Sequence, residues 1–514
     1  MQIIFLNPQG NFDPQDSYWT EHPDFGGQLV YVKETALALA ELGHRVDIVT
    51  RQISDPAWPE FSAPLDAYPG HPRVRIVRIP CGPPGFLPKE ALWPYLGTDW
   101  LRGILDFYQQ GGSSPDVVTA HYADGGLTAA LLQRETGLPF TWTAHSLGAQ
   151  KMDKLQVNRE NLAAMDQRFH FARRLMAERV AMSHAAGLIT STHQEQQDQY
   201  GHRAYHGALR SRSRSGPRWA VIPPGVNRRV FSTEPHELDA LLRRRIEAAL
   251  TRDLAPERRE LPWVICSSRL DRKKNHLGLV KAFAQNEKLR ATANLAVAVR
   301  GAENPLRERS QFEGEAGVIL AEIAALLDEH ALWPVVTSFP LNDQAELAAA
   351  YRLAARRRSV FALTALYEPF GLAPLEAMSC GLPAVVTRNG GPAESLSDRR
   401  TGGEYGLLVD PTDPSEIARA LLVLLSSPAK WQRYRQAGIE RVANRYTWES
   451  TAKGYMSLLT ELRAPQSPAA PGGLPIPDYF TQPTPDNDIA LEELAALYFG
   501  PDDSYETIPD RRSR

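Results

Sequence analysis

The sequence of 514 residues has little cysteine, no long hydrophobic run and almost no net charge. Its three cysteines, Cys81, Cys266 and Cys380, form no CxxC pair, so we expect neither a zinc site nor a disulfide framework, and a reduced, cytoplasmic setting. No run of about 18 apolar residues is present, so a membrane span is not expected. A formal net charge of -3 gives no basic field that would attract nucleic acid or membrane surfaces.

Two phosphate-binding motifs of other α/β proteins are also missing. Neither a GxGxxG dinucleotide fingerprint nor a GxxxxGK[ST] P-loop occurs, which argues against NAD-linked and P-loop enzymes. A phosphatase module is not expected either, because no DxDxT-type nucleophile motif appears and few residues follow Leu462.

Short apolar runs alternate with amphipathic stretches, which is the pattern of parallel α/β folding, and the length favours two domains. The first series of predicted strands is Gln2–Leu6, Arg45–Thr50, Val74–Ile79, Asp116–His121, Phe140–His145 and Val221–Ile222. The second series is Trp263–Ser267, Leu295–Arg300, Val335–Phe339, Val360–Thr364, Ala384–Thr387 and Gly406–Val409. The two series predict two doubly wound, Rossmann-like domains that face a central cleft at the carboxyl ends of the strands.

Two segments interrupt this pattern. Residues 202–218 contain a Ser-Arg-Ser-Arg-Ser run, which is either an RNA or phosphopeptide contact or, as the neutral chain favours, a solvated loop insertion. Residues 464–486 are rich in proline, glycine and glutamine and predict an extended tail segment. The tail ends in a short helical pattern, Ala490–Leu497, that could dock on a groove.

The stretch from Glu368 to Glu376 combines two carboxylates with a predicted helix start near Leu372. The free N–H groups of a first helical turn and the helix dipole favour an anion. Carboxylates accept paired hydrogen bonds from neighbouring hydroxyls, as a ribose or hexose offers. The alternative is two surface glutamates around a turn.

Arg269 and Lys274 follow another predicted strand. Two fixed cations just past a strand end suit a diphosphate, and an arginine can bind it through two parallel hydrogen bonds. A solvated basic turn is the alternative, but the neighbouring anion-ready helix start favours the diphosphate.

The first half offers weaker signals. Phe25-Gly-Gly-Gln28 precedes a helix, where paired glycines allow close approach of a ligand, although such a pair is more often only a turn. His121 and His145 each end a predicted strand, a position where a lone histidine is usually structural. Lys89 and Arg173 have no interpretation from spacing alone, and Arg174 is spaced for an ordinary ion pair with Glu178 one helical turn on.

Together these residues resemble a known family. The Gly26-Gly27-Gln28 turn, His145, the Arg269 and Lys274 pair and the Glu368-x7-Glu376 box resemble the retaining GT-B glycosyltransferases of the sucrose synthase and sucrose-phosphate synthase group. The similarity to bacterial sucrose-phosphate synthases covers nearly the whole chain. It includes Asn7–Phe12, Asp16–Gln28, Gly85–Lys89, His145–Lys151 and Ile476–Phe480.

The resemblance implies a role for each of these residues. Arg269 and Lys274 would hold the donor diphosphate, Glu376 the ribose, and Glu368 the donor sugar. The remaining implied donor contacts are His145, Gly27, Phe370, Gly371, Leu372, Arg300 and Leu341. The implied acceptor contacts, which would bind the sugar and its phosphate, are Gly26, Gln28, Lys89, Ser146, Lys151, Arg174 and, as an alternative to Arg174, Arg173.

The implied reaction transfers glucose from UDP-glucose or ADP-glucose to fructose 6-phosphate with retention of configuration. No DxD metal motif lies beside the predicted cleft, and the resemblance implies neither a metal nor another cofactor. A separate sucrose-phosphate phosphatase would consume the product. Rival hypotheses are a mannosylfructose-phosphate synthase using GDP-mannose, a sucrose synthase using free fructose, and a sugar-nucleotide sensor without catalytic activity.

The resemblance also sets the expected domains. Residues 1–225 would form the acceptor domain and residues 226–447 the sugar-nucleotide domain. Residues 448–514 would form a crossover helix, starting at Trp448, and a tail that packs back on the first domain.

Overall fold

The computed structural model describes residues 1–19, 22, 24–112, 114–210, 217–463 and 473–500. The chain forms two compact units: unit 1 is Met1–Ile222 with the chain from Ala452 onward, and unit 2 is Pro223–Thr451. The expected boundaries after residues 225 and 447 differ from these by three and four residues. The serine-arginine run 211–215 and the first part of the expected tail segment, 464–472, lie outside the described residues.

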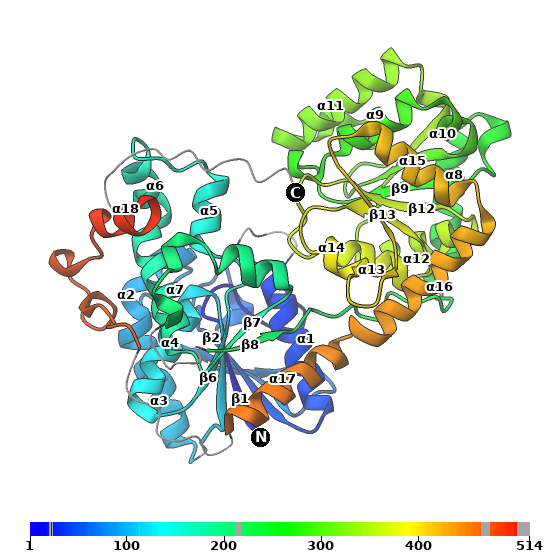
Figure 1. Cartoon of the computed structure of the whole chain (residues 1–514). Helices are drawn as coiled ribbons and strands as arrows, with labels where there is room; N and C mark the ends of the chain where they lie inside the picture. The colour runs from blue at the N-terminus through cyan, green and yellow to red at the C-terminus, as the bar shows by residue number, and fades with distance from the viewer. Residues whose placement is uncertain (20–21, 23, 113, 211–216, 464–472, 501–514) are drawn as a thin grey trace. The chain divides into compact units, whose positions relative to one another are not determined.

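Unit 1 contains an eight-stranded sheet, parallel except for the antiparallel edge strand β3 (Figure 1). The strand order is β3-β4-β2-β1-β5-β6-β7-β8. The strands are β1 Gln2–Leu6, β2 Arg45–Arg51, β3 Leu65–Ala67, β4 Val74–Ile79, β5 Val117–His121, β6 Phe140–Thr143, β7 Gly187–Thr190 and β8 Arg218–Val221. The central strands are buried on both faces, which is why they appear in the sequence as short apolar runs.

The helices of unit 1 cover both faces of this sheet. They are α1 Gly27–Glu41, α2 Trp93–Tyr95, α3 Leu101–Gln110, α4 Tyr122–Thr136, α5 Gly148–Lys154, α6 Leu162–Phe169, α7 Phe171–His184 and α18 Leu491–Phe499. The long helix α17, Trp448–Arg463, enters unit 1 at Ala452 and places Tyr455 in hydrogen-bonding contact with Tyr31 of α1. The two hydroxyl oxygens are 3.2 Å apart.

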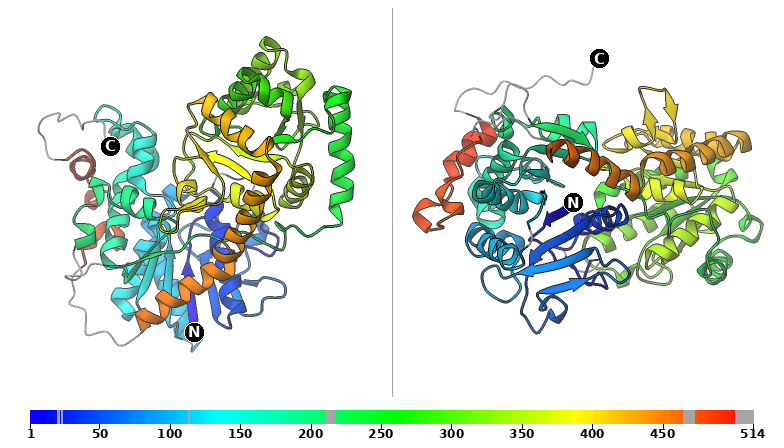
Figure 2. Two further views of the ribbon diagram at one scale, coloured as in Figure 1. Left: turned by 45° about the vertical axis from the view of Figure 1, so that its right-hand side comes forward. Right: turned by 90° about the horizontal axis from the view of Figure 1, so that it is seen from below.

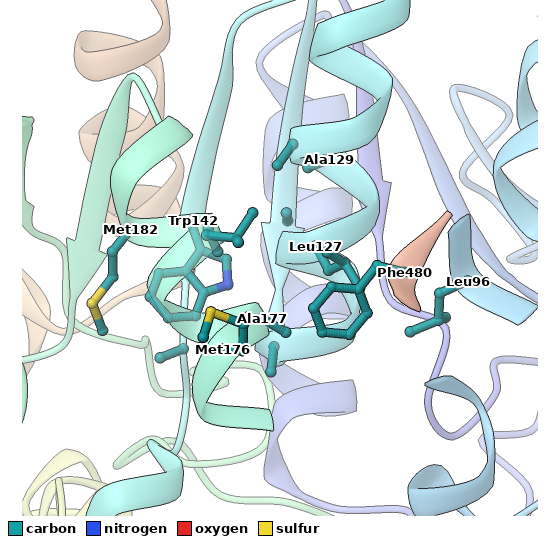
Figure 3. Close-up of a cluster of buried hydrophobic side chains, with 14 of the residues drawn as sticks. Leu96, Leu127, Ala129, Trp142, Met176, Ala177, Met182 and Phe480 are labelled. Atoms are coloured by element: carbon teal, nitrogen blue, oxygen red, sulfur yellow. The ribbon is translucent and has the colours of Figure 1, made fainter. Parts of the chain in front are cut away.

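The tail is part of the core of unit 1. Phe480 is buried and lies beside Leu96 and Leu127 (Figure 3). A side chain at Gly97 would meet the carbonyl oxygen of Phe480, so this glycine permits the close packing. Helix α18 packs beside α6 and α7 (Figure 2). The tail therefore docks on unit 1 through apolar contacts, as its helical pattern suggested.

Unit 2 contains a parallel six-stranded sheet of order β11-β10-β9-β12-β13-β16. Its strands are β9 Trp263–Ser267, β10 Asn294–Ala298, β11 Val336–Phe339, β12 Val360–Leu363, β13 Ala384–Thr387 and β16 Leu407–Val409, beside the small pair β14 Ser397–Asp398 and β15 Gly403–Glu404. Its helices are α8 Leu238–Asp253, α9 His276–Gln285, α10 Glu287–Thr292, α11 Gly314–Glu329, α12 Gln344–Arg356, α13 Leu372–Ser379, α14 Pro392–Ser395, α15 Pro414–Leu425 and α16 Pro428–Arg445.

The two predicted doubly wound sheets are confirmed, with small differences. Strands β3, β7, β14 and β15 were not predicted; β3, β14 and β15 are only two or three residues long, and β7, Gly187–Thr190, was missed as an apolar run. The predicted strand to His145 ends at Thr143, because His145 has a left-handed backbone (φ 55°) that no strand accommodates. Among the described residues, no helix is long and apolar enough to cross a membrane.

Candidate active site

In unit 2 the candidate site residues gather where the strand order reverses. Strand β9 lies between β10 and β12, so the segments that leave β9 and β12 turn to opposite faces of the sheet. Arg269 and Lys274 follow β9, and Glu368 follows β12. Open α/β sheets bind ligands at the carboxyl ends of strands at such a point.

Lys274 and Glu368 form a direct ion pair. Nζ of Lys274 lies 2.6 Å from Oε2 of Glu368, and both side chains are mostly buried. The lysine is positioned by a short turn in which Asp271 accepts a hydrogen bond from the Lys274 N–H. The backbone N–H of Leu366 donates to the carbonyl of Lys273, which ties the two loops together. The structure thus brings together two residues that lie far apart in the sequence.

The backbone of Glu368 is fixed by the loop after β13. Its N–H donates to the carbonyl of Asn389, and its carbonyl accepts from the N–H of Gly391. Gly390 has a left-handed backbone (φ 99°), and a Cβ there would lie 2.0 Å from the Glu368 carbonyl oxygen. Glycine is therefore required at residue 390 for this approach.

Helix α13 begins at Leu372, after Gly371 in a left-handed conformation (φ 89°). The predicted helix start is confirmed, and it leaves the N–H groups of the first turn facing the end of β12. Glu376 lies one turn into this helix. Burial raises the pKa of its carboxyl to about 7, which marks a carboxylate with little solvent around it.

The other expected donor contacts of unit 2 follow the carboxyl ends of β9, β10, β11 and β12. Arg269 is exposed directly after β9, with no ion-pair partner among the described residues. Arg300 is exposed beyond the end of β10, and Leu341 is buried beyond the end of β11. Phe370 packs near Tyr446, with ring centroids 6.1 Å apart.

In unit 1, the carboxyl ends of β1, β5 and β6 carry the candidate residues. Gly26 is the N-cap of α1, Gly27 is its first residue and Gln28 is buried. The space where a Gly27 side chain would lie is open. The turn therefore leaves open space beside the backbone of Gly27.

His145 follows β6 and is enclosed by aromatic rings. Its ring stacks on Tyr122 with centroids 5.8 Å apart and meets the edge of Tyr31 at 5.0 Å. Its Nε2 lies 2.9 Å from Nδ1 of His121. Burial lowers the pKa of His145 to about 3, so this imidazole is neutral near pH 7.

Three cations, which we call the basic cluster, gather near one small cavity. The cluster consists of Lys89, Lys151 and Arg174. A cavity of about 30 Å³ is lined by Lys89, Arg174 and Phe169, among others. Nζ of Lys151 lies 3.9 Å from the centroid of the Phe169 ring, so it reaches the same place. Burial, and to a smaller extent the nearby Arg174, lowers the pKa of Lys151 to about 8.

Arg174 is held by a buried network. Its Nε donates to Glu178 at 2.9 Å, so the expected i,i+4 ion pair is present. A second guanidinium nitrogen donates to the carbonyl of Ser146 at 2.7 Å. Glu178 also accepts from the N–H of Gly148 and from the hydroxyl of Tyr205. The ion pair with Glu178 does not prevent Arg174 from binding an anion. Its Nη1 makes no hydrogen bond within the described residues and is available to donate one.

Arg173 is engaged elsewhere. It makes two hydrogen bonds to Asp488 of the tail, at 2.9 and 2.6 Å, and lies over the ring of Tyr479. It does not line the cavity of the basic cluster. Of the two alternatives, the structure therefore places Arg174 at the cavity and Arg173 at the tail.

Of the residues that line this cavity, sequence reasoning named only Lys89 and Arg174. Asp124, in the first turn of α4, and Gln9, after β1, both line it. Burial raises the pKa of Asp124 to about 7. The position of Asp124 three residues past the strand-end His121 is the signal that could have indicated it. Within the described residues, no group of three or more His, Cys, Asp or Glu side chains could hold a metal ion.

Comparison with known proteins agrees with this geometry. Residues 26–225 match the model for the glycosyl transferase 4-like domain, and residues 252–441 match that for glycosyl transferases group 1. A probable sucrose-phosphate synthase of Thermosipho melanesiensis is 41% identical over 459 residues, which cover 89% of this chain and 96% of the relative.

The chain belongs to the sucrose-phosphate synthase family.

Other members of this family extend the comparison. Sucrose-phosphate synthase 4 of Arabidopsis thaliana is 33% identical over 90% of this chain, but the chain spans only 48% of that relative. The solved sucrose-phosphate synthase of Thermosynechococcus elongatus has a TM-score of 0.63 and 26% identity, over 90% of this chain and 99% of that one. The chain is therefore a GT-B glycosyltransferase with two Rossmann-like domains, as predicted.

Proposed function

We propose that this enzyme transfers glucose from UDP-glucose or ADP-glucose to fructose 6-phosphate, giving sucrose 6-phosphate. The basic cluster in unit 1 is the observation that carries the proposal. Three cations beside one cavity at the carboxyl end of the sheet suit the phosphate of a sugar phosphate. A free sugar would give them nothing to bind, so sucrose synthase chemistry on free fructose is disfavoured.

Unit 2 supplies the groups that a sugar nucleotide needs. Arg269 and Lys274 hold the diphosphate, with the start of α13 contributing its N–H groups. Glu376 accepts hydrogen bonds from the ribose hydroxyls, and Glu368, with the backbone from Phe370 to Leu372, binds the hydroxyls of the transferred sugar. The separation of these two carboxylates by a loop and one helical turn fits two different sugar rings.

The chemical step follows from these groups. The bond between the anomeric carbon and the diphosphate oxygen breaks as the acceptor hydroxyl attacks the same face of the sugar. The proton of that hydroxyl passes to the leaving phosphate oxygen, and the configuration is retained. Lys274 and Arg269 stabilise the charge that develops on the leaving group, which is the largest contribution in many enzymes. No metal or other cofactor takes part in this scheme.

The product carries a phosphate, and this scheme includes no step that removes it. A separate phosphatase acting on sucrose 6-phosphate would complete the sequence of reactions, in the cytoplasm where sugar nucleotides serve as donors.

Turnover with a panel of donors tests the proposal. The protein is incubated with fructose 6-phosphate and UDP-glucose, ADP-glucose, GDP-glucose or GDP-mannose, and the products are followed by mass and by NMR of the anomeric proton. We expect a hexosyl fructose phosphate from UDP-glucose or ADP-glucose with an α-glucosyl signal. Preference for GDP-mannose would establish a mannosylfructose-phosphate synthase, an inverted anomer would refute retention, and nucleotide binding without turnover would indicate a sensor.

A further inference from the structure

Two histidines at strand ends of unit 1 form a direct hydrogen bond. His121 is the last residue of β5 and His145 follows β6. Nδ1 of His121 and Nε2 of His145 are 2.9 Å apart, and the two rings stack with centroids 5.1 Å apart. The side chain of His121 is fully buried, whereas that of His145 is half-buried.

Both rings are neutral near pH 7. Burial and the neighbouring His145 lower the pKa of His121 well below its ordinary value, and burial lowers that of His145. A neutral imidazole has one N–H donor and one acceptor nitrogen. A hydrogen bond between two such rings therefore has two possible arrangements, which differ in the ring that donates.

The surroundings of His121 favour one of them. Its other nitrogen, Nε2, is buried and has no hydrogen-bond partner among the described residues. If the proton were on Nε2, a buried N–H would be left without an acceptor, which folded proteins rarely tolerate. With the proton on Nδ1, His121 donates to Nε2 of His145. The proton of His145 is then on Nδ1.

The backbone and neighbours of His145 hold the ring in this position. Its left-handed φ of 55° is uncommon for a residue with a side chain and fixes where the ring enters the site. Tyr31 and Tyr122 enclose the ring together with His121. Nδ1 of His145 makes no hydrogen bond within the described residues, so it is available to a ligand.

We propose that His121 is a positioning residue that fixes the tautomer of His145, so that His145 meets the substrate as a hydrogen-bond donor through Nδ1. The N–H at Nδ1 of His145 would donate a hydrogen bond to an oxygen of the transferred sugar or of the reacting centre. This inference rests on the proposed function only in that His145 contacts the substrate. The tautomer itself is a property of the free protein.

The tautomer can be measured without turnover. Long-range proton–nitrogen NMR spectra of the full chain with 15N-labelled histidine show which ring nitrogen carries the proton, and His121→Asn identifies the His121 signals. We expect both His121 and His145 to be protonated on Nδ1 at pH 7. A proton on Nε2 of His121 would overturn the proposal, whatever the enzyme's activity.

A pair of variants tests the effect on catalysis. In His121→Asn, the amide nitrogen can take the place of Nδ1 and donate to His145, whereas His121→Leu offers no hydrogen bond. We expect the leucine variant to lose about 10- to 100-fold in kcat, by analogy with the losses seen when the partners that orient metal-bound histidines are removed. The KM for fructose 6-phosphate should change little, and the asparagine variant should recover most of the loss.

His206→Leu is the matched control, because His206 is an exposed histidine of the same unit. Equal activities of the asparagine and leucine variants would reject the positioning role. If the leucine variant does not fold, the tautomer measured in the unaltered protein still decides. If the unaltered protein transfers no sugar while His121 carries its proton on Nδ1, the proposed function fails and the tautomer assignment stands.

Discussion

The two candidate sites differ in how their charges are arranged. In unit 2 one cation, Lys274, meets one carboxylate, Glu368, across two loops, and Arg269 remains exposed. In unit 1 the three cations of the basic cluster come from a 3-10 turn and from helices α5 and α7 and gather at one cavity. Each of these cations also has a carboxylate partner: Asp24 for Lys89, Glu90 for Lys151 and Glu178 for Arg174. Three cations around one cavity suit a terminal phosphate, whereas the single lysine and glutamate of unit 2 suit a ligand that has both a diphosphate and hydroxyls.

The largest effect is expected at Lys274. Lys274→Ala should lower kcat by about 100- to 1,000-fold, because removing one preorganised group at the developing charge has effects of this size. Steady-state kinetics with UDP-glucose and fructose 6-phosphate measure it. Lys273→Ala, an exposed neighbour on the same turn, is the control and should be nearly silent. Equal losses in both variants would show that the turn, rather than the Lys274 charge, matters.

The buried arginine of unit 1 should affect both stability and binding. Arg174→Ala leaves Glu178 buried without its ion-pair partner, which is expected to cost about 3–5 kcal/mol in unfolding free energy. It should also raise the KM for fructose 6-phosphate. Denaturant unfolding and kinetics separate the two effects. In Arg174→Ala/Glu178→Gln, stability should largely recover while KM stays high; an unchanged KM in both variants would remove Arg174 from the phosphate site.

The same contrast marks what the sequence alone could predict. The Glu368-x7-Glu376 box spans nine residues around a helix start that the local sequence predicts. The residues of the basic cluster are scattered through unit 1, and only the family resemblance connected them. Asp124 was missed although it lies three residues past the strand-end His121, because its place at the cavity depends on how β5 and α4 pack. Most parallel strands were predicted, since each is a buried apolar run, whereas β7 was not.

The pH dependence of nucleotide binding should reveal the ribose carboxylate of unit 2. Hydroxyls bind the ionised form of Glu376, so the pKa of about 7 in the free protein falls on binding. Affinity is therefore full above pH 7 and decreases as pH falls through 7, by at most about tenfold per pH unit. Calorimetric titration of UDP between pH 6 and 8 measures this slope. The slope should vanish in Glu376→Gln; if it persists there, another group is titrating.

The smallest effect is expected at the tail. Arg173→Ala breaks a partly exposed ion pair with Asp488, so a loss of about 0–1 kcal/mol in unfolding free energy is expected. Because Arg173 does not line the cavity, the KM for fructose 6-phosphate should not change. Asp488→Asn provides the matched change on the other partner. A clear rise of KM in Arg173→Ala alone would give Arg173 a part in acceptor binding.

The most direct measurement of the central claim compares two acceptors. The ratio of kcat/KM for fructose 6-phosphate over free fructose is determined for the unaltered enzyme, for Lys151→Ala and for Lys154→Ala, an exposed lysine on the same helix. A charged hydrogen bond contributes about 1.5–3 kcal/mol, so the ratio should fall about 10- to 100-fold in Lys151→Ala and stay unchanged in Lys154→Ala. An unchanged ratio in Lys151→Ala, or an equal loss with free fructose, would contradict the claim that the basic cluster binds the acceptor phosphate.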